Sequence, residues 1–400
     1  MPKYISLKKG GWSLALWSVI PAAFIGPGTV ATCASAGSGF GLTLLWALLF
    51  SALATFALQE AAARITIASG KNLGEVIALK YRGRWAGLLK TLLFGAVALG
   101  CSAYQAGNIL GAVSGLALLT EGQQSIWVIA LGTVAALLLW QGNMRAITGV
   151  LAAIVFLMGV VFAVVALRTG TAPSAVLTNA ITPKFPAGSG LIIVGLIGTT
   201  VVPYNLFLAS GLSRGQQVGE MRLGIGLAVL IGGIISAAIL LSGTLISGDF
   251  SFPSLAGALS GKLGTWASSF FGIGLFAAGA SSSVTAPLAA AITGQALFGG
   301  ENGQWSPRSL RFRAVWASVL FIGLGFGLSG IKPVPAIIAA QAVNGLLLPA
   351  VAVFLLLAVN DRQLLPARYA NGPLRNTALI AVTAIAAMLG AYNIWRAFGG

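Results

Sequence analysis

Histidine is absent from this chain, and acidic residues are scarce. The 400 residues hold seven Asp and Glu against 23 Lys and Arg, and they include only two cysteines. Without histidine, the chain lacks the commonest metal ligand and the commonest proton shuttle. No catalytic carboxylate pair or activated nucleophile is visible, so we expect neither an enzyme nor a bound cofactor. Cys33 and Cys101 lie in apolar segments, where small packing residues are expected rather than a disulfide.

Charge of either sign is rare. Only 8% of residues are charged and 57% are hydrophobic, whereas soluble domains carry roughly 25% charged residues. The bilayer must therefore be the solvent of this chain. The 54 glycines agree, because glycine is enriched in transmembrane helices. The net charge of +16 does not indicate nucleic-acid binding, because Lys and Arg fall in short segments between apolar stretches.

What the sequence does contain is a series of apolar stretches long enough to cross a membrane as helices. They predict an all-α integral membrane protein with a single transmembrane domain and short connections. The eleven expected spans are 12–37, 42–69, 86–118, 124–140, 145–168, 189–212, 221–247, 264–297, 311–329, 333–359 and 374–396.

Basic residues predict the orientation, because cytoplasmic loops are enriched in Lys and Arg. If the N-terminus is cytoplasmic, most of the 23 basic residues fall on the cytoplasmic side, and Arg64 lies within the second span. The outer segments then hold only Arg168, Lys184, Lys262, Lys332 and Arg396. We expect a cytoplasmic N-terminus, an outer C-terminus and the plasma (inner) membrane of a prokaryote, with anionic lipid headgroups near the positive side.

Two of the spans contain helix breakers at their middle. Gly26-Pro27-Gly28-Thr29 interrupts the first span, and the segment 198–205, which contains Pro203, interrupts the sixth. Because they lie five spans apart, we expect inverted repeats over about 11–168 and 189–359, with 374–396 as an extra helix. Interrupted segments at matching places in two halves are the best sequence indication of a transporter binding site near the bilayer midplane. The alternative is that these prolines only shape helix packing.

Four short stretches carry a recognisable pattern: 26–32, 202–208, 279–285 and 341–343 with Pro349. Together and in this order they resemble the NRAMP family of proton-coupled divalent-metal transporters. The resemblance extends from the first span to the last. It implies a leucine-transporter-like fold of about eleven helices, with helices 1 and 6 broken, that works by alternating access.

The resemblance also shows where this chain departs from the family. The family binds metal through Asp and Asn of helix 1 and through an Ala carbonyl and a Met sulfur of helix 6. A His follows in helix 6, and acidic residues of helix 3 are associated with proton transfer. In this sequence the two positions of helix 1 are Gly26 and Thr29, and those of helix 6 are Thr199, Val202 and, for the His, Tyr204. The acidic positions of helix 3 are Ser102 and Gln105. Only the glutamine of helix 10 is retained, as Gln341.

These substitutions predict a binding site with uncharged walls. A doubly charged ion at the midplane would then lack compensating charge, so no high-affinity metal site is expected, although a largely hydrated Mg²⁺ is harder to exclude. Opposed half-helix ends would suit a zwitterion or a polar organic molecule. The expected substrate-binding residues are Gly26, Pro27, Gly28, Thr29, Thr199, Val202, Tyr204, Asn205 and Gln341.

The leading interpretation is therefore a secondary transporter of a small polar, organic or zwitterionic solute. One alternative is a transporter of divalent metal ions, either Mn and Fe or hydrated Mg. Another alternative is a non-transporting membrane sensor or partner-binding protein.

Candidate coupling and gating residues lie elsewhere. Glu60 and Arg64 stand four residues apart in the second span, the favourable order for an ion pair on a helix. Ser281 and Ser282 could form a sodium site with carbonyls of the first helix. Ser102 and Gln105 occupy the positions of the family's acidic residues on helix 3. A coupling ion, Na⁺ or H⁺, is thus a candidate partner, although no protonatable carrier is visible at mid-membrane depth.

Overall fold

The computed structural model describes residues 25–80, 86–142, 145–299 and 304–399, and every regular element in these ranges is a helix. Ten helical segments of the described residues are long and apolar enough to cross a membrane. The long elements are α3 (Leu45–Ser69), α5 (Ala86–Ala117), α6 (Gln124–Gln141), α7 (Arg145–Leu167), α9 (Gly190–Thr200) with α10 (Pro203–Leu212), α11 (Val218–Gly243), α13 (Trp266–Phe298), α14 (Leu310–Leu328), α15 (Pro333–Val359) and α16 (Pro373–Gly399).

These segments confirm ten of the eleven expected spans, with small differences at their ends. The remaining span, 12–37, is only partly described. Its second part is α2 (Pro27–Phe40), and residues 12–24 lie outside the described ranges. The break expected within that span can therefore be followed only from Ile25 onward.

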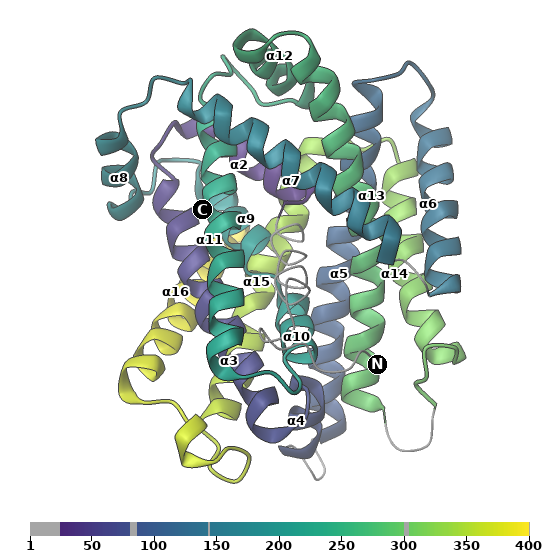
Figure 1. The fold of residues 1–400 in the computed structure, drawn as a ribbon, viewed down its shortest axis with the longest axis vertical. Helices are drawn as coiled ribbons and strands as arrows, with labels where there is room; N and C mark the ends of the chain where they lie inside the picture. Colours follow the sequence, from purple (N-terminus) through teal and green to yellow (C-terminus); the bar gives the residue numbers. More distant parts are fainter. Residues whose placement is uncertain (1–24, 81–85, 143–144, 300–303, 400) are drawn as a thin grey trace.

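Short helices lie at both ends of the bundle, where the sequence predicted only short connections. At the lower end in Figure 1 is α4 (Leu73–Lys80), and at the upper end are α8 (Pro173–Ile181) and α12 (Phe252–Leu263). The start of α12 is fixed by a capping box, in which Ser251 and Ser254 exchange side-chain and backbone hydrogen bonds. A 3-10 turn, Ala367–Tyr369, follows α15.

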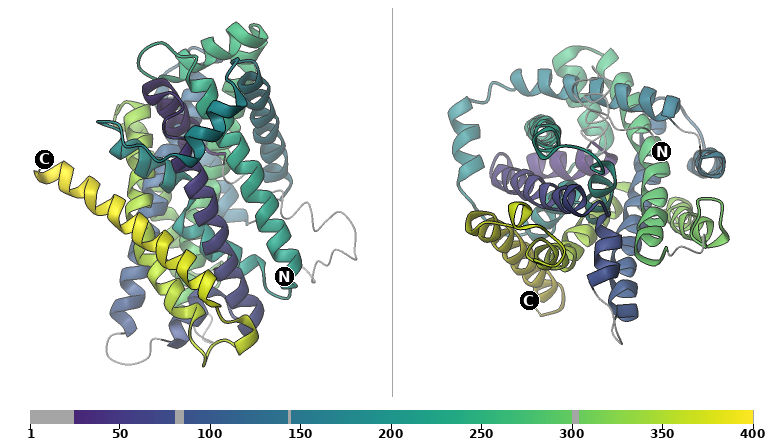
Figure 2. Two further views of the ribbon diagram at one scale, coloured as in Figure 1. Left: turned by 90° about the vertical axis from the view of Figure 1, so that its left-hand side faces the viewer. Right: turned by 60° about the horizontal axis from the view of Figure 1, so that its bottom comes forward.

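The interior is formed by α2, α5, α9, α13 and α15, which pack against one another. On the outside, α6 and α14 stand at one edge, and α7 crosses the upper half of the bundle obliquely (Figure 1). The last helix, α16, lies against the periphery and projects away from the bundle at its C-terminal end (Figure 2). This arrangement places the expected site residues of α2, α9 and α15 in the interior.

Candidate functional site

The sixth span is broken where the sequence predicts it. α9 ends at Thr200 and α10 begins at Pro203. Neither residue between them is helical: Val201 has φ -93° and ψ 82°, and Val202 has extended backbone. Proline has no N–H, so Pro203 cannot donate to the carbonyl of Thr199 and continue the ladder of the helix. The last carbonyls of α9 are therefore left for other partners. Val201 N–H donates to the Ile197 carbonyl at 2.8 Å.

The first described helix begins beside this break. Gly26 caps α2 with extended backbone, Pro27 is the first helical residue, and the Gly26 carbonyl accepts from Val30 N–H at 3.1 Å. The Thr29 hydroxyl lies 2.9 Å from the Thr199 hydroxyl, and both side chains are buried. This hydrogen bond joins the first turn of α2 to the last turn of α9, residues 170 positions apart in the chain.

Gln341 of α15 closes one side of this contact. A Cβ on Gly28 would overlap the Gln341 amide, so the glycine is what lets that amide approach the start of α2. Gln341 is buried, and its Oε1 has no hydrogen-bond partner in the described residues. A buried acceptor without a partner is costly, and such an oxygen indicates a water or a ligand that completes it.

α9 and α15 touch backbone to backbone. A Cβ on Gly198 would overlap the Gln341 carbonyl, and a Cβ on Gly345 would overlap the Val194 carbonyl region. The Gly198 carbonyl also accepts a hydrogen bond of 3.0 Å from the hydroxyl of Tyr104 on α5. The same tyrosine ring lies edge-on to Tyr204, with centroids 6.0 Å apart.

Tyr104 was not among the expected site residues. It follows Cys101 by three positions and precedes Asn108 by four, so the helical spacing of these side chains on α5 was the available signal.

The other expected binding residues surround the same place. Val202, Tyr204 and Asn205 are buried in the first turn of α10 and just before it, and Asn205 N–H donates to the Val202 carbonyl at 3.0 Å. Within the described part of the chain, Gly26 has room for a side chain: the nearest atom to a Cβ there would be the Ser282 hydroxyl, at 3.8 Å. The structure thus brings α2, α9, α10, α13 and α15 together around one buried, uncharged region, which we call the midplane site.

Three of the candidate coupling residues have partners or neighbours outside the midplane site. Ser102 donates to the Ala98 carbonyl of its own helix at 2.9 Å. Gln105 points to α13 and donates to the Ser283 carbonyl at 3.0 Å, with its Oε1 unpartnered among the described residues. Ser281 lines an apolar pocket between α6, α7 and α13. Ser282 alone of this group faces the start of α2.

A second buried polar region, which we call the inner cluster, is built around Glu60 of α3. The predicted ion pair forms: Arg64 Nε lies 3.0 Å from Glu60 Oε1. The sequence did not reveal a third member, Arg222 of α11, whose guanidinium donates to the same oxygen at 2.8 and 2.9 Å. No local pattern could have shown it, because Arg222 is 162 residues away.

Arg64 also ties this cluster to the segment that precedes α16. Its guanidinium donates to the Tyr369 carbonyl and, at 2.6 Å, to Asn371 Oδ1. Only 1% of Arg64 is exposed, so its guanidinium is surrounded by protein groups, of which Glu60 carries the counter-charge. The gating role expected for Glu60 and Arg64 stays a prediction.

The overall architecture defines the class of protein. One solved structure similar to this chain is that of Mhp1, a nucleobase-cation-symport-1 family transporter, with a TM-score of 0.61 at 14% identity over 97% of this chain and 93% of that one. Together with the broken sixth span, this confirms the expected leucine-transporter-like fold. Manganese-transporter structures from Eremococcus coleocola align with a TM-score of 0.76 at 19% identity, for example over 98% of this chain and 88% of that chain.

The family follows from the sequence match. The family model for natural resistance-associated macrophage protein-like (Nramp) proteins matches residues 18–396, and the chain belongs to this family. Among curated relatives, the divalent metal cation transporter MntH of Verminephrobacter eiseniae is 27% identical over 385 residues, which cover 92% of this chain and 84% of the relative. MntH of Bacillus subtilis is 28% identical over 349 residues, covering 80% and 77%.

These relatives correct the substrate expected from the sequence. A small polar or zwitterionic organic solute was inferred from the uncharged walls of the site, and this interpretation was wrong: the relatives are named as divalent metal cation transporters. The physical reason is the hydration state that was assumed for the bound ion. The leading argument assumed a largely dehydrated ion and kept hydrated Mg²⁺ only as an alternative, whereas a divalent cation that keeps part of its water shell loses much less solvation.

Proposed function

We propose that this chain transports a divalent metal cation across the membrane by alternating access, and that the cation keeps part of its hydration shell at the midplane site. The names of the relatives support the substrate class. The observation that carries the proposal is the meeting of Thr29, Thr199 and Gln341 at the break. It gathers neutral oxygens from three helices in one buried place.

The site chemistry fits a hydrated ion better than a bare one. In the described residues, no group of three His, Cys, Asp or Glu side chains is placed to hold a metal. Hydroxyl, amide and carbonyl oxygens remain, and these are ligands of hard cations or acceptors for the water molecules around them. Magnesium in particular dehydrates reluctantly and usually keeps several waters. Weak binding and broad selectivity among divalent ions follow from such a ligand set.

Helix dipoles decide on which side of the site the cation sits. The start of α2 at Pro27 is a positive helix end, and the end of α9 at Thr200 is a negative one. A cation is therefore favoured beside the last carbonyls of α9 and disfavoured beside the N–H groups of α2. We place the cation nearer to α9, with Gln341 Oε1 accepting a hydrogen bond from one of its waters.

The orientation in the membrane belongs to the same proposal. The distribution of basic residues supports a cytoplasmic position for the end of the bundle that carries α4. α8 and α12 then lie on the outer side. Since the curated relatives named above come from bacteria, the membrane would be the inner membrane of a prokaryote.

Flux into proteoliposomes tests the proposal. Purified full-length protein should carry Mn²⁺ and Mg²⁺ into liposomes loaded with a fluorescent metal indicator, with a membrane potential negative inside as the driving force. Titration calorimetry with the same two ions should show weak binding. Uptake of neither ion above the level of protein-free liposomes would contradict the proposal and favour a sensor or partner-binding role.

A further inference from the structure

An apolar pocket of about 310 Å³ lies between α6, α7 and α13, outside the midplane site. Its wall on α6 consists of residues spaced three and four apart, which form one stripe along the helix: Trp127, Ala130, Leu131, Val134, Ala135 and Leu138. Because six positions from 127 to 138 line it, the pocket is elongated along the helix axis. Its length covers roughly 16 Å at 1.5 Å per residue.

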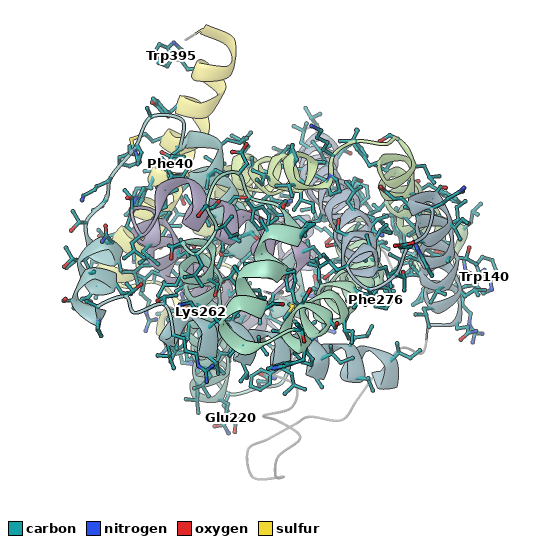
Figure 3. The ribbon with its side chains drawn as sticks, turned by 90° about the horizontal axis from the view of Figure 1, so that it is seen from above. Phe40, Trp140, Glu220, Lys262, Phe276 and Trp395 are labelled. Carbon is teal, nitrogen blue, oxygen red and sulfur yellow. The ribbon has the colours of Figure 1, made fainter. Side chains whose placement is uncertain are left out.

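The pocket opens sideways, toward the surroundings of the bundle. Two of its lining residues are half exposed, Val134 at 54% and Ile147 at 46%. Neighbouring side chains that face outward on α6 and α7 are also large and apolar, such as Leu137 and Val150. In Figure 1, α6 stands at the edge of the bundle, and Figure 3 shows Trp140 of this helix at the outer rim, with Phe276 of the pocket wall further in. In a membrane-spanning chain, this mouth faces lipid hydrocarbon.

The lining chemistry decides the occupant. Of the side chains that line the pocket, all but Ser281 and Trp127, with its indole N–H, lack a polar group. Water in such a cavity would lack hydrogen-bond partners, and apolar cavities stay dry or take up apolar molecules. An elongated apolar pocket with its mouth in the hydrocarbon region matches a lipid tail. We propose that this pocket binds one acyl chain of a membrane phospholipid.

The position of the pocket gives the bound acyl chain a structural role. Its back wall is the middle of α13, with Ala280, Ser281 and Val284. Ser282, the residue after Ser281, lies about 100° further around the helix, and its hydroxyl lies 3.8 Å from where a Cβ on Gly26, at the start of α2, would be. A single helix, α13, thus separates the acyl chain from the midplane site. The acyl chain packs against the face of α13 that lines the pocket.

A structural experiment with labelled lipid tests the occupant. The full chain is reconstituted in nanodiscs made of phosphatidylcholine whose acyl chains carry bromine at mid-chain, and its structure is determined by electron cryomicroscopy. We expect bromine density between α6, α7 and α13. Empty space there would overturn the proposal, and so would polypeptide density from a second copy or from residues 1–24.

Variants make the test specific. A280F and A130F each fill the pocket from a different wall, so a folding failure of one leaves the other informative. A153F places the same ring on an exposed position of α7 outside the pocket and is the matched control. Native mass spectrometry should show loss of a retained phospholipid in A280F and A130F but not in A153F. Equal lipid retention in all the variants and the unmodified chain would contradict the acyl-chain site. This binding readout is independent of transport, so its failure leaves the proposed function untouched.

Discussion

The midplane site and the inner cluster are both buried and polar, yet they are built in opposite ways. At the midplane site, Thr29, Thr199 and Gln341 are neutral, and one amide oxygen has no partner among the described residues. In the inner cluster, Glu60 is charged and receives hydrogen bonds from two guanidinium groups. An unfilled acceptor leaves room for a ligand, whereas a saturated ion cluster holds helices together.

The largest effect is expected from breaking the inner cluster. Glu60→Gln removes the carboxylate and leaves Arg64 buried without its counter-charge. Removing one partner of a buried ion pair costs about 3–5 kcal/mol of folding stability. The thermal midpoint of the purified protein should therefore fall sharply. The matched control is Glu75→Gln, which breaks the more exposed pair with Arg214 at 2.8 Å and should cost about 0–1 kcal/mol. Equal effects of the two substitutions would mean that the inner cluster does not hold the helices.

Adding charge to the midplane site should produce the next largest effect. Gly26→Asp combined with Val202→Met introduces a carboxylate and a thioether at the positions where the family resemblance places metal ligands. Among the described residues, the Ser282 hydroxyl is the only group within 4 Å of a Cβ at position 26, which leaves space for the aspartate. Mn²⁺ affinity measured by calorimetry should rise at least tenfold, or by about 1.4 kcal/mol. Unchanged Mn²⁺ binding would argue against the assignment of these two positions.

Removing a single hydroxyl from the midplane site should have a smaller effect. Thr199→Val deletes the partner of Thr29 and one candidate oxygen for the ion or its water. A lost hydrogen bond of this kind costs about 1 kcal/mol, or roughly fivefold in flux at low ion concentration. Thr200→Val is the control, because its hydroxyl only donates to the Leu196 carbonyl of the same helix at 3.2 Å. Flux in the control should stay close to that of the unmodified chain.

The smallest effect is expected for the pH dependence of thermal stability, through the carboxylate of Asp361. The hydrogen bond from Lys80, together with further donors from the backbone, lowers the pKa of Asp361. A carboxylate with a lowered pKa stabilises the fold above the unfolded-state pKa of about 3.9, and this contribution is lost as the pH falls through the folded-state value. Thermal stability should thus be insensitive to this group between about pH 6 and 8. The slight fall of the thermal midpoint at acid pH should be absent in Asp361→Asn. If the thermal midpoint instead changed with pH near neutrality and Asp361→Asn removed that change, the assignment would be contradicted.

Sequence reasoning located the parts of the molecule that depend on local chemistry. The apolar stretches predicted the long helices, and the missing N–H of Pro203 predicted the break between α9 and α10. The i, i+4 spacing predicted the pair of Glu60 and Arg64. Each of these features is encoded by residues close together in the chain.

Features that depend on distant segments could not be predicted. The pairing of Arg222 with Glu60 and that of Gln105 with the Ser283 carbonyl depend on how α3, α5, α11 and α13 pack. The substrate class was also misjudged from residue types alone. Counting ligands on the protein ignores those that the ion brings along as water, and for Mg²⁺ these are often the majority.

The contact between α9 and α15 has a consequence for turnover. Because Gly198 and Gly345 carry only hydrogen atoms, the two backbones approach so closely that a Cβ at either position would overlap the other helix. We therefore expect α9 and α15 to move together as one rigid body during transport, with bending concentrated at Val201 and Val202. Spin labels on these two helices should keep a constant separation through the cycle, while a pair on α9 and α10 should report two distances.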